Sequence, residues 1–172
     1  MRRLFTIAAA GLLCLTIVGP VAAKGPPTIT RLDLTVISAD DFAGTCDFPV
    51  ELVDSFSNSS MLEFPANENR DQLVTFVGGF RSTITNLDSG KSLDIRYFGN
   101  ARYLFQADGS IDIVTGGTVL AWFYPEDVLS GMDPGIYLMT GPTHLLVDAA
   151  TFLALEPVQA KGRVVDLCAA LS

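Results

Sequence analysis

Alternation of apolar and polar residues with a period of two, broken at short intervals by turn-forming residues, is the feature that most constrains this chain. In residues 92–97, for example, Leu93, Ile95 and Tyr97 fall on one face. Successive side chains of a β-strand point to opposite faces of a sheet, so this period is typical of strands. Because no segment has a long helical period, we expect an all-β fold.

The pattern predicts roughly ten strands, with boundaries uncertain by a few residues. They are residues 31–36, 80–85, 92–97, 103–105, 111–115, 118–124, 136–139, 143–147, 152–155 and 162–167. Most connections in the second half are short, so sequence neighbours should pair antiparallel, and a long meander of this kind tends to close on itself. The sequence therefore favours an antiparallel up-and-down β-barrel of about 8–10 strands. The alternative is a two-sheet β-sandwich, with residues 125–134 crossing between the sheets.

The first residues have the order of a secretory signal peptide. Two arginines precede an apolar run that ends at Gly19 and Pro20, and the small residues Ala22 and Ala23 follow. The run is shorter than the ~20 residues that span a bilayer. We expect a signal peptide over residues 1–23, a flexible leader over 24–29 and a single β domain over 30–172. An uncleaved anchor is the alternative.

Cleavage after Ala23 makes an acidic chain more acidic. Residues 1–23 hold two of the eleven Lys and Arg residues and none of the nineteen Asp and Glu residues, so the formal charge moves from −8 to −10. A surface of this charge repels phosphate backbones and anionic lipids. The sequence therefore predicts a secreted or cell-envelope protein with no nucleic-acid partner and no membrane association after cleavage.

Two cysteines remain after the signal peptide, with its Cys14, is removed. Cys46 and Cys168 make an even pair in an oxidising compartment, which predicts a disulfide between the start and the end of the domain. A pair of free thiols is the alternative. Two cysteines and one histidine fall short of the four ligands of a structural zinc site, so we expect no metal and no cofactor.

Catalytic motifs are missing from the sequence. The single histidine is His144, and no Gly-x-Ser-x-Gly motif accompanies it, so a structural role is the favoured interpretation. A Ser-His-Asp arrangement needs only one histidine, so a secreted hydrolase that uses His144 with nearby acids stays open. Glu126, Asp127 and Asp133 share one loop, and we interpret them as ordinary loop acids rather than calcium ligands.

Aromatic residues offer a candidate ligand-binding site, with a place in the core as the alternative. The alternation places Trp122 and Tyr124 on one face of a predicted strand. Pointing outward, they would stack on a sugar or an apolar ligand; pointing inward, they belong to the core. In a closed barrel, Tyr97, Tyr103, Phe105 and Trp122 would line a ligand cavity if the interior is hollow. These five residues are the candidate ligand-binding set.

Three stretches of the chain resemble a group of uncharacterised exported β-rich proteins of high-GC Gram-positive bacteria. They are residues 46–50 (CDFPV), 85–91 (TNLDSGK) and 164–172 (VVDLCAALS). The resemblance implies an exported β domain and supports the pairing of Cys46 with Cys168. Because the group has no assigned activity, it implies no functional residue.

Three functional hypotheses follow from the sequence. The first is a secreted non-catalytic domain that binds a small apolar ligand, a glycan or a surface protein, as an aromatic-rich β domain without a catalytic set indicates. The second is the hydrolase that uses His144. The third is a structural or adhesive component of the cell envelope.

Overall fold

The computed structural model describes residues 26–67, 71–98 and 100–172. Within them lie fourteen β-strands and one short helix, so the predicted all-β class is confirmed. The predicted signal peptide and Cys14 lie outside the described residues. The first strand begins at Thr28, slightly before the expected start of the domain at residue 30.

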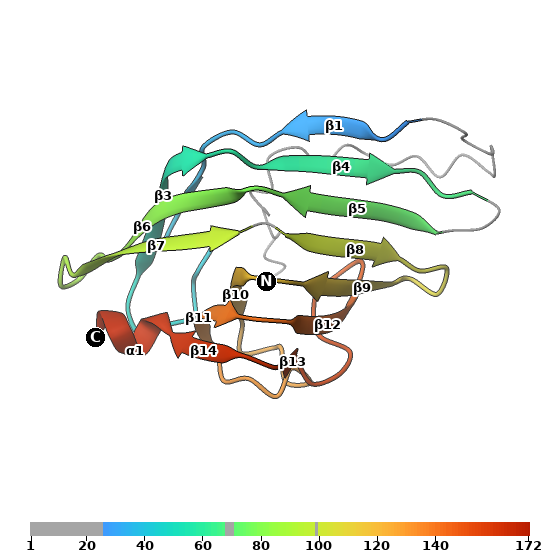
Figure 1. Cartoon of the computed structure of the whole chain (residues 1–172). Coiled ribbons are helices and arrows are strands. Elements are labelled where there is room, and N and C mark those ends of the chain that lie inside the picture. Colours follow the sequence, from blue (N-terminus) through green and yellow to red (C-terminus); the bar gives the residue numbers. More distant parts are fainter. Residues whose placement is uncertain (1–25, 68–70, 99) are drawn as a thin grey trace.

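The strands form three antiparallel sheets (Figure 1). The seven-stranded sheet has the order β1 (Thr28–Arg31), β4 (Ser60–Phe64), β5 (Gln72–Val77), β8 (Ala101–Phe105), β9 (Ser110–Thr115), β12 (Thr143–Asp148) and β13 (Gln159–Ala160). The four-stranded sheet has the order β2 (Val36–Ile37), β3 (Val50–Ser57), β6 (Gly79–Asn86) and β7 (Ser92–Phe98). The three-stranded sheet has the order β10 (Thr118–Phe123), β11 (Gly135–Thr140) and β14 (Arg163–Asp166), and helix α1 (Leu167–Leu171) follows it.

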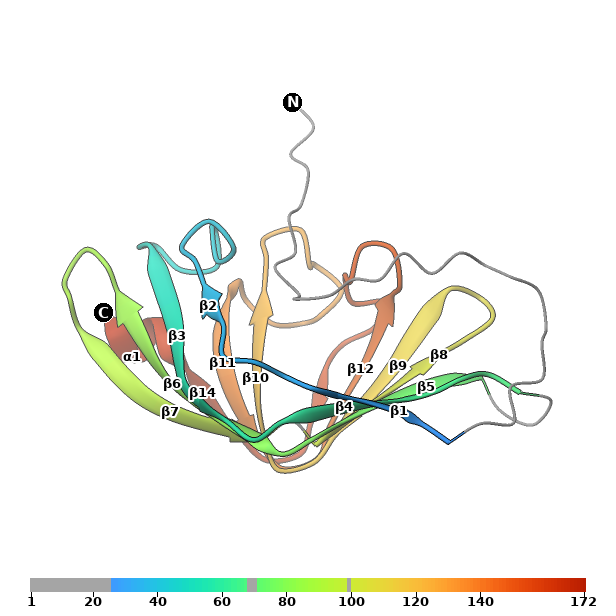
Figure 2. The ribbon, with the colours of Figure 1, turned by 90° about the horizontal axis from the view of Figure 1, so that it is seen from above.

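Several pairs of consecutive strands are joined by a short bend, and the two strands of each pair belong to different sheets. β5 continues into β6 at Gly78, β9 into β10 at Gly116 and Gly117, β11 into β12 at Gly141, and β13 into β14 at Gly162. Seen from above, the sheets spread apart from this line of bends (Figure 2). Each of these long extended segments is therefore bent near its middle, and its two halves belong to different sheets.

The bends require glycine because backbones approach one another closely there. The amide of Gly141 donates a hydrogen bond of 2.6 Å to the carbonyl oxygen of Gly117 on the neighbouring bend. A Cβ atom on Gly162 would lie 1.6 Å from the carbonyl oxygen of Thr140, which excludes any side chain. Glycine in a strand pattern is typical of such corners.

The favoured barrel is not formed, because the bends split the meander into separate sheets instead of letting its edges meet. None of the three sheets closes on itself over the described residues, and packed antiparallel sheets fit the β-sandwich alternative. The core shows this packing. Leu52 and Ile84 from the four-stranded sheet are buried with Leu120 and Ile136 from the three-stranded sheet, and Leu171 of α1 joins them.

Strands β10 and β11 of the three-stranded sheet are packed on both faces, whereas β14 is mostly exposed. Leu120 faces the core just described, whereas Phe123, Tyr137 and Met139 pack on the other side with Leu145 of β12. A strand between two layers needs apolar residues on both faces. The uninterrupted apolar run of β10, Val119 to Phe123, meets this need.

The predicted disulfide is confirmed. Cys46 and Cys168, which are 122 positions apart in the sequence, are bonded, with their Cα atoms 5.5 Å apart. The bond attaches α1 to the segment before β3. Asp166 caps the helix, because its side chain accepts a hydrogen bond from the amide of Ala169.

Two of the predicted strands differ in the structure. Residues 31–36 form the end of β1 and the start of β2 rather than one strand, because Thr35 turns toward Asp54, whose carboxylate accepts hydrogen bonds from its amide and hydroxyl. Residues 152–155 form a loop with one bridge, between Ala154 and Val147, since Phe152 has a left-handed φ of 60°.

Strands β3, β4 and β5 lie outside the segments in which the sequence pattern predicts strands. In β3 the pairing with β6 shifts register between Asp54 and Phe56, which is the mark of a β-bulge. A bulge adds a residue and reverses the apolar alternation, so the period-two signal of this strand is interrupted.

Candidate functional site

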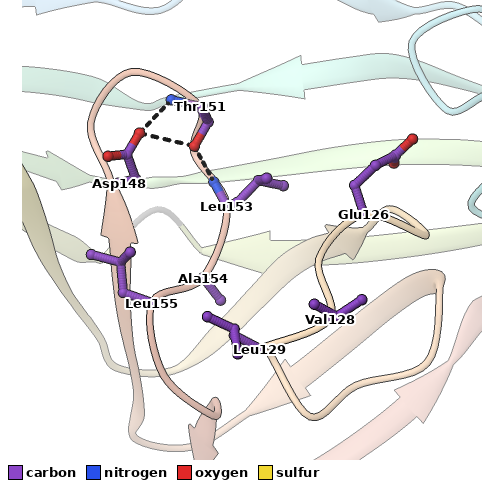
Figure 3. Close-up of a pocket in the computed structure, with 8 residues that line it drawn as sticks. All are labelled: Glu126, Val128, Leu129, Asp148, Thr151, Leu153, Ala154 and Leu155. Carbon is purple, nitrogen blue, oxygen red and sulfur yellow. Dashed lines mark hydrogen bonds between the residues drawn. The ribbon is translucent and has the colours of Figure 1, made fainter.

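A hollow of about 330 Å³ lies between two loops at one edge of the molecule. The β10–β11 loop covers residues 124–134, and the β12–β13 loop covers residues 149–158. Figure 3 shows the residues that line the hollow, which we call the loop hollow: Glu126, Val128, Leu129, Asp148, Thr151, Leu153, Ala154 and Leu155. Five of the eight are apolar, and the polar members are two carboxylates and one hydroxyl.

Hydrogen bonds hold the two loops together. Asp127 is buried, and its carboxylate accepts a 2.8 Å hydrogen bond from the amide of Ala154. The amide of Val158 donates a second bond of 2.8 Å to the carbonyl oxygen of Ser130. The Ser130 hydroxyl, itself buried, donates to the carbonyl oxygen of Asp127. The walls of the loop hollow are therefore fixed to each other before any ligand arrives.

The β12–β13 loop is also ordered by its own first residue. The carboxylate of Asp148 accepts hydrogen bonds from the amide and hydroxyl of Thr151 (Figure 3). It also accepts one from the amide of Ala150. The hydrogen bonds from Thr151 hold the pKa of the Asp148 carboxyl below its ordinary value. Asp148 therefore carries its negative charge throughout the neutral and mildly acidic range.

Exposed apolar side chains surround the loop hollow. Val128 is 79% exposed and Leu129 55% exposed, and Phe152 and Leu155 are exposed beside them. An apolar patch on an ordered loop costs free energy in water, and such patches mark binding surfaces. This group of exposed residues is the feature of the loops that folding alone does not explain.

The sequence contains one signal for this site, a pair of apolar residues in a loop. The strand predicted for the neighbouring segment makes that signal hard to recognise. Val128 and Leu129 lie next to each other in a loop that holds three acids, where no strand partner accounts for them. Residues 152–155 are apolar and flanked by turn residues, which predicts a strand. The first segment is expected to be a loop from the sequence, but only the structure shows that the second is also a loop and that the two meet.

The five aromatic residues predicted as a ligand set do not form one site. Tyr103 and Phe105 of β8 pack on Ile111 and Val147 in the seven-stranded sheet. Burial raises the pKa of the Tyr103 phenol, as expected for a side chain held in an apolar layer. Both residues take part in sheet packing.

Trp122 lies on β10 of the three-stranded sheet instead, and Tyr124 follows directly after that strand. Trp122 packs edge-to-face on Phe42, and its indole nitrogen donates to the Tyr124 hydroxyl at 3.2 Å. That hydroxyl donates in turn to the carbonyl oxygen of Asp41. The pair attaches the segment before β3 to the core.

Tyr97 occupies a third place, the inner face of the four-stranded sheet. Its ring stacks on Phe80, and its hydroxyl donates to the buried carboxylate of Asp54 at 3.2 Å. The Asp54 carboxylate also accepts hydrogen bonds from Ser82 and Thr35. Burial, the largest effect, raises the pKa of the Tyr97 phenol far above its ordinary value. This network connects β3, β6 and β7 with the segment just before β2, so Tyr97 has a structural role.

His144 lies on β12 between two carboxylates. Its Nε2 atom is 2.9 Å from Asp112 of β9, and its Nδ1 atom is 3.5 Å from Glu156 of the β12–β13 loop. A histidine that activates a hydroxyl needs one nitrogen directed at that hydroxyl. Because both nitrogens face carboxylates, the arrangement does not favour the hydrolase hypothesis.

The two carboxylates contact opposite nitrogens of the His144 ring, so the three groups do not converge on one point where a metal ion would bind. Among the described residues, no group of three or more His, Cys, Asp and Glu side chains is arranged to hold a metal ion. The same part of the chain contains no helix with the length and apolar character needed to cross a membrane.

Comparison of the chain with models of protein families, with curated proteins and with solved structures produced no match.

Proposed function

We propose that this protein is an exported, non-catalytic binding module that takes a small apolar ligand into the loop hollow. The observation that carries the proposal is the group of exposed apolar side chains around a hollow whose two walls are hydrogen-bonded together. Export is supported by the signal-peptide pattern of residues 1–23 and by the bond between Cys46 and Cys168, which suits an oxidising compartment.

Covering the exposed side chains supplies the driving force for binding. Burial of a whole Val or Leu side chain contributes about 1.5–3 kcal/mol, and partial burial of Val128 and Leu129 contributes a share of this. The hydrogen bonds of Asp127 and Ser130 order the loops in advance. Less conformational entropy is therefore lost on binding.

The size and lining of the loop hollow favour an aliphatic small molecule. Its volume of about 330 Å³ falls at the lower end of ligand sites. None of its lining residues is aromatic, whereas a sugar-binding surface uses the faces of aromatic rings. The lining thus supports the apolar-ligand hypothesis over the glycan hypothesis.

Titration with 1-octanol by calorimetry tests the proposal. We expect saturable binding to the mature protein, and Leu129→Ser should weaken it about fivefold or more, since most of a leucine side chain's apolar contact is lost. Leu87→Ser is the matched control, because Leu87 is 47% exposed on the turn between β6 and β7. No saturable binding, or equal weakening by both variants, would refute the proposal.

A further inference from the structure

We infer that the ligand of the loop hollow is a small cationic amphiphile, with an apolar body and an ammonium or guanidinium head. The inference rests on the proposed function and adds the charge of the ligand to it. It comes from the two charged residues at the rim, Glu126 and Asp148, and from the lack of any basic residue among those that line the hollow.

The two carboxylates stand on opposite sides of the apolar floor. Figure 3 shows Glu126 on the β10–β11 loop and Asp148 at the end of β12, with Leu153 between them and Ala154 and Leu129 below. A ligand whose chain covers the apolar floor would therefore place its head near one carboxylate or the other. A positive head would be attracted there, and a negative head such as a carboxylate would be repelled.

The rim charges are not neutralised by the protein. Within the part of the chain that the structure describes, the ion pairs involve His144, and no lysine or arginine pairs with Glu126 or Asp148. The hydrogen bonds that Asp148 accepts from Ala150 and Thr151 all end on its Oδ1 atom and come from uncharged groups, so they leave the negative charge of the carboxylate uncompensated. The lowered pKa of Asp148 keeps this charge in place at mildly acidic pH.

Three probes with one chain length separate the effect of charge from that of apolar contact. Octylammonium, 1-octanol and octanoate carry positive, neutral and negative heads, and each is titrated calorimetrically below its aggregation concentration. We expect octylammonium to bind about two- to fivefold more tightly than octanol, the factor that one partly exposed ion pair supplies. Octanoate should bind more weakly than octanol, and added salt should reduce these differences.

Neutral variants locate the effect at the rim. The double variant Glu126→Gln/Asp148→Asn should bring the octylammonium-to-octanol ratio close to one, and the asparagine still accepts the hydrogen bonds of Thr151. Asp88→Asn/Asp94→Asn removes the same charge from the β6–β7 region and should leave the ratio unchanged. Octanol binding by each variant confirms that its loop hollow is intact.

The outcomes separate the two proposals. Equal affinity for the three probes, or a ratio that the rim variant leaves unchanged, overturns the inference about charge while the apolar site stands. An equal loss in both double variants also overturns it, because the preference would then reflect net charge alone. Failure of every probe to bind saturably refutes the proposed function itself.

Discussion

The carboxylate of Asp127 accepts a hydrogen bond of 2.8 Å from the amide of Ala154, across the two loops that enclose the loop hollow. Both residues are buried, and they are 27 positions apart in the sequence. This contact fixes the spacing of the walls, because the exposed Val128 and Leu129 follow Asp127 directly and Leu155 follows Ala154.

Asp127→Ala should lower the free energy of unfolding by about 1–3 kcal/mol, because it leaves the buried amide of Ala154 without an acceptor. It should also weaken octanol binding and speed hydrogen exchange at Ala154. Asp133→Ala, at an exposed acid of the same loop, serves as the control and should change none of these. Urea denaturation and amide exchange provide the measurements. Equal exchange at Ala154 in both variants would mean that the bond does not order the loops.

Gly162→Ala should destabilise the protein by more than about 3 kcal/mol, since the added Cβ would overlap the carbonyl oxygen of Thr140 and the backbone must move. Gly116→Ala is the comparison, because a Cβ there has no neighbour within 4 Å and its φ is not positive. We expect this second change to be nearly neutral. Thermal unfolding of the two variants tests the close approach at the bend, which a mild effect of Gly162→Ala would disprove.

Replacement of both Cys46 and Cys168 by alanine should lower the free energy of unfolding by about 2–5 kcal/mol, because the bond restricts a long loop in the unfolded chain. Mass spectrometry after alkylation without reductant should find no free thiol in the mature protein. Two alkylated cysteines would contradict the pairing.

The raised pKa of Tyr97 predicts a loss of stability in alkaline solution. In the unfolded chain a tyrosine loses its proton near pH 10, whereas burial keeps Tyr97 protonated in the fold. Above pH 10 the unfolded state therefore binds fewer protons than the folded state, so the free energy of unfolding decreases as pH rises. Below pH 10 this contribution is complete.

Tyr97→Phe should reduce that alkaline slope, at the cost of about 0.5–1.5 kcal/mol for the lost hydrogen bond to Asp54. Urea denaturation at several pH values, with tyrosinate absorbance as a second readout, measures both effects. An unchanged slope in the variant would show that Tyr97 ionises normally in the folded protein.

The fold class follows from local chemistry that a sequence displays, but the architecture depends on contacts between distant residues. The alternation of apolar and polar residues in 92–97 predicts one strand and the residues on each of its two faces. The overlap that would arise between Gly162 and Thr140 depends on how bends far apart in the sequence meet, and glycine alone does not specify it. The barrel prediction failed at this step, whereas the disulfide prediction needed only compartment and cysteine number.

The sequence did not predict the loop hollow for a related reason. Aromatic residues such as Trp122 attract attention in a sequence, yet Trp122 packs on Phe42 in the core. Leu129 and Leu155 look like ordinary apolar residues until the structure shows them exposed on neighbouring loops. Exposure is a property of the whole fold, so no local pattern predicts it.

Amide chemical-shift mapping of the mature protein with 1-octanol tests the central claim most directly. The account predicts saturable shifts confined to residues 126–129 and 148–155, on the two loops that line the hollow. Shifts that centre instead on Tyr103 and Phe105, or that never saturate at any residue, would contradict it.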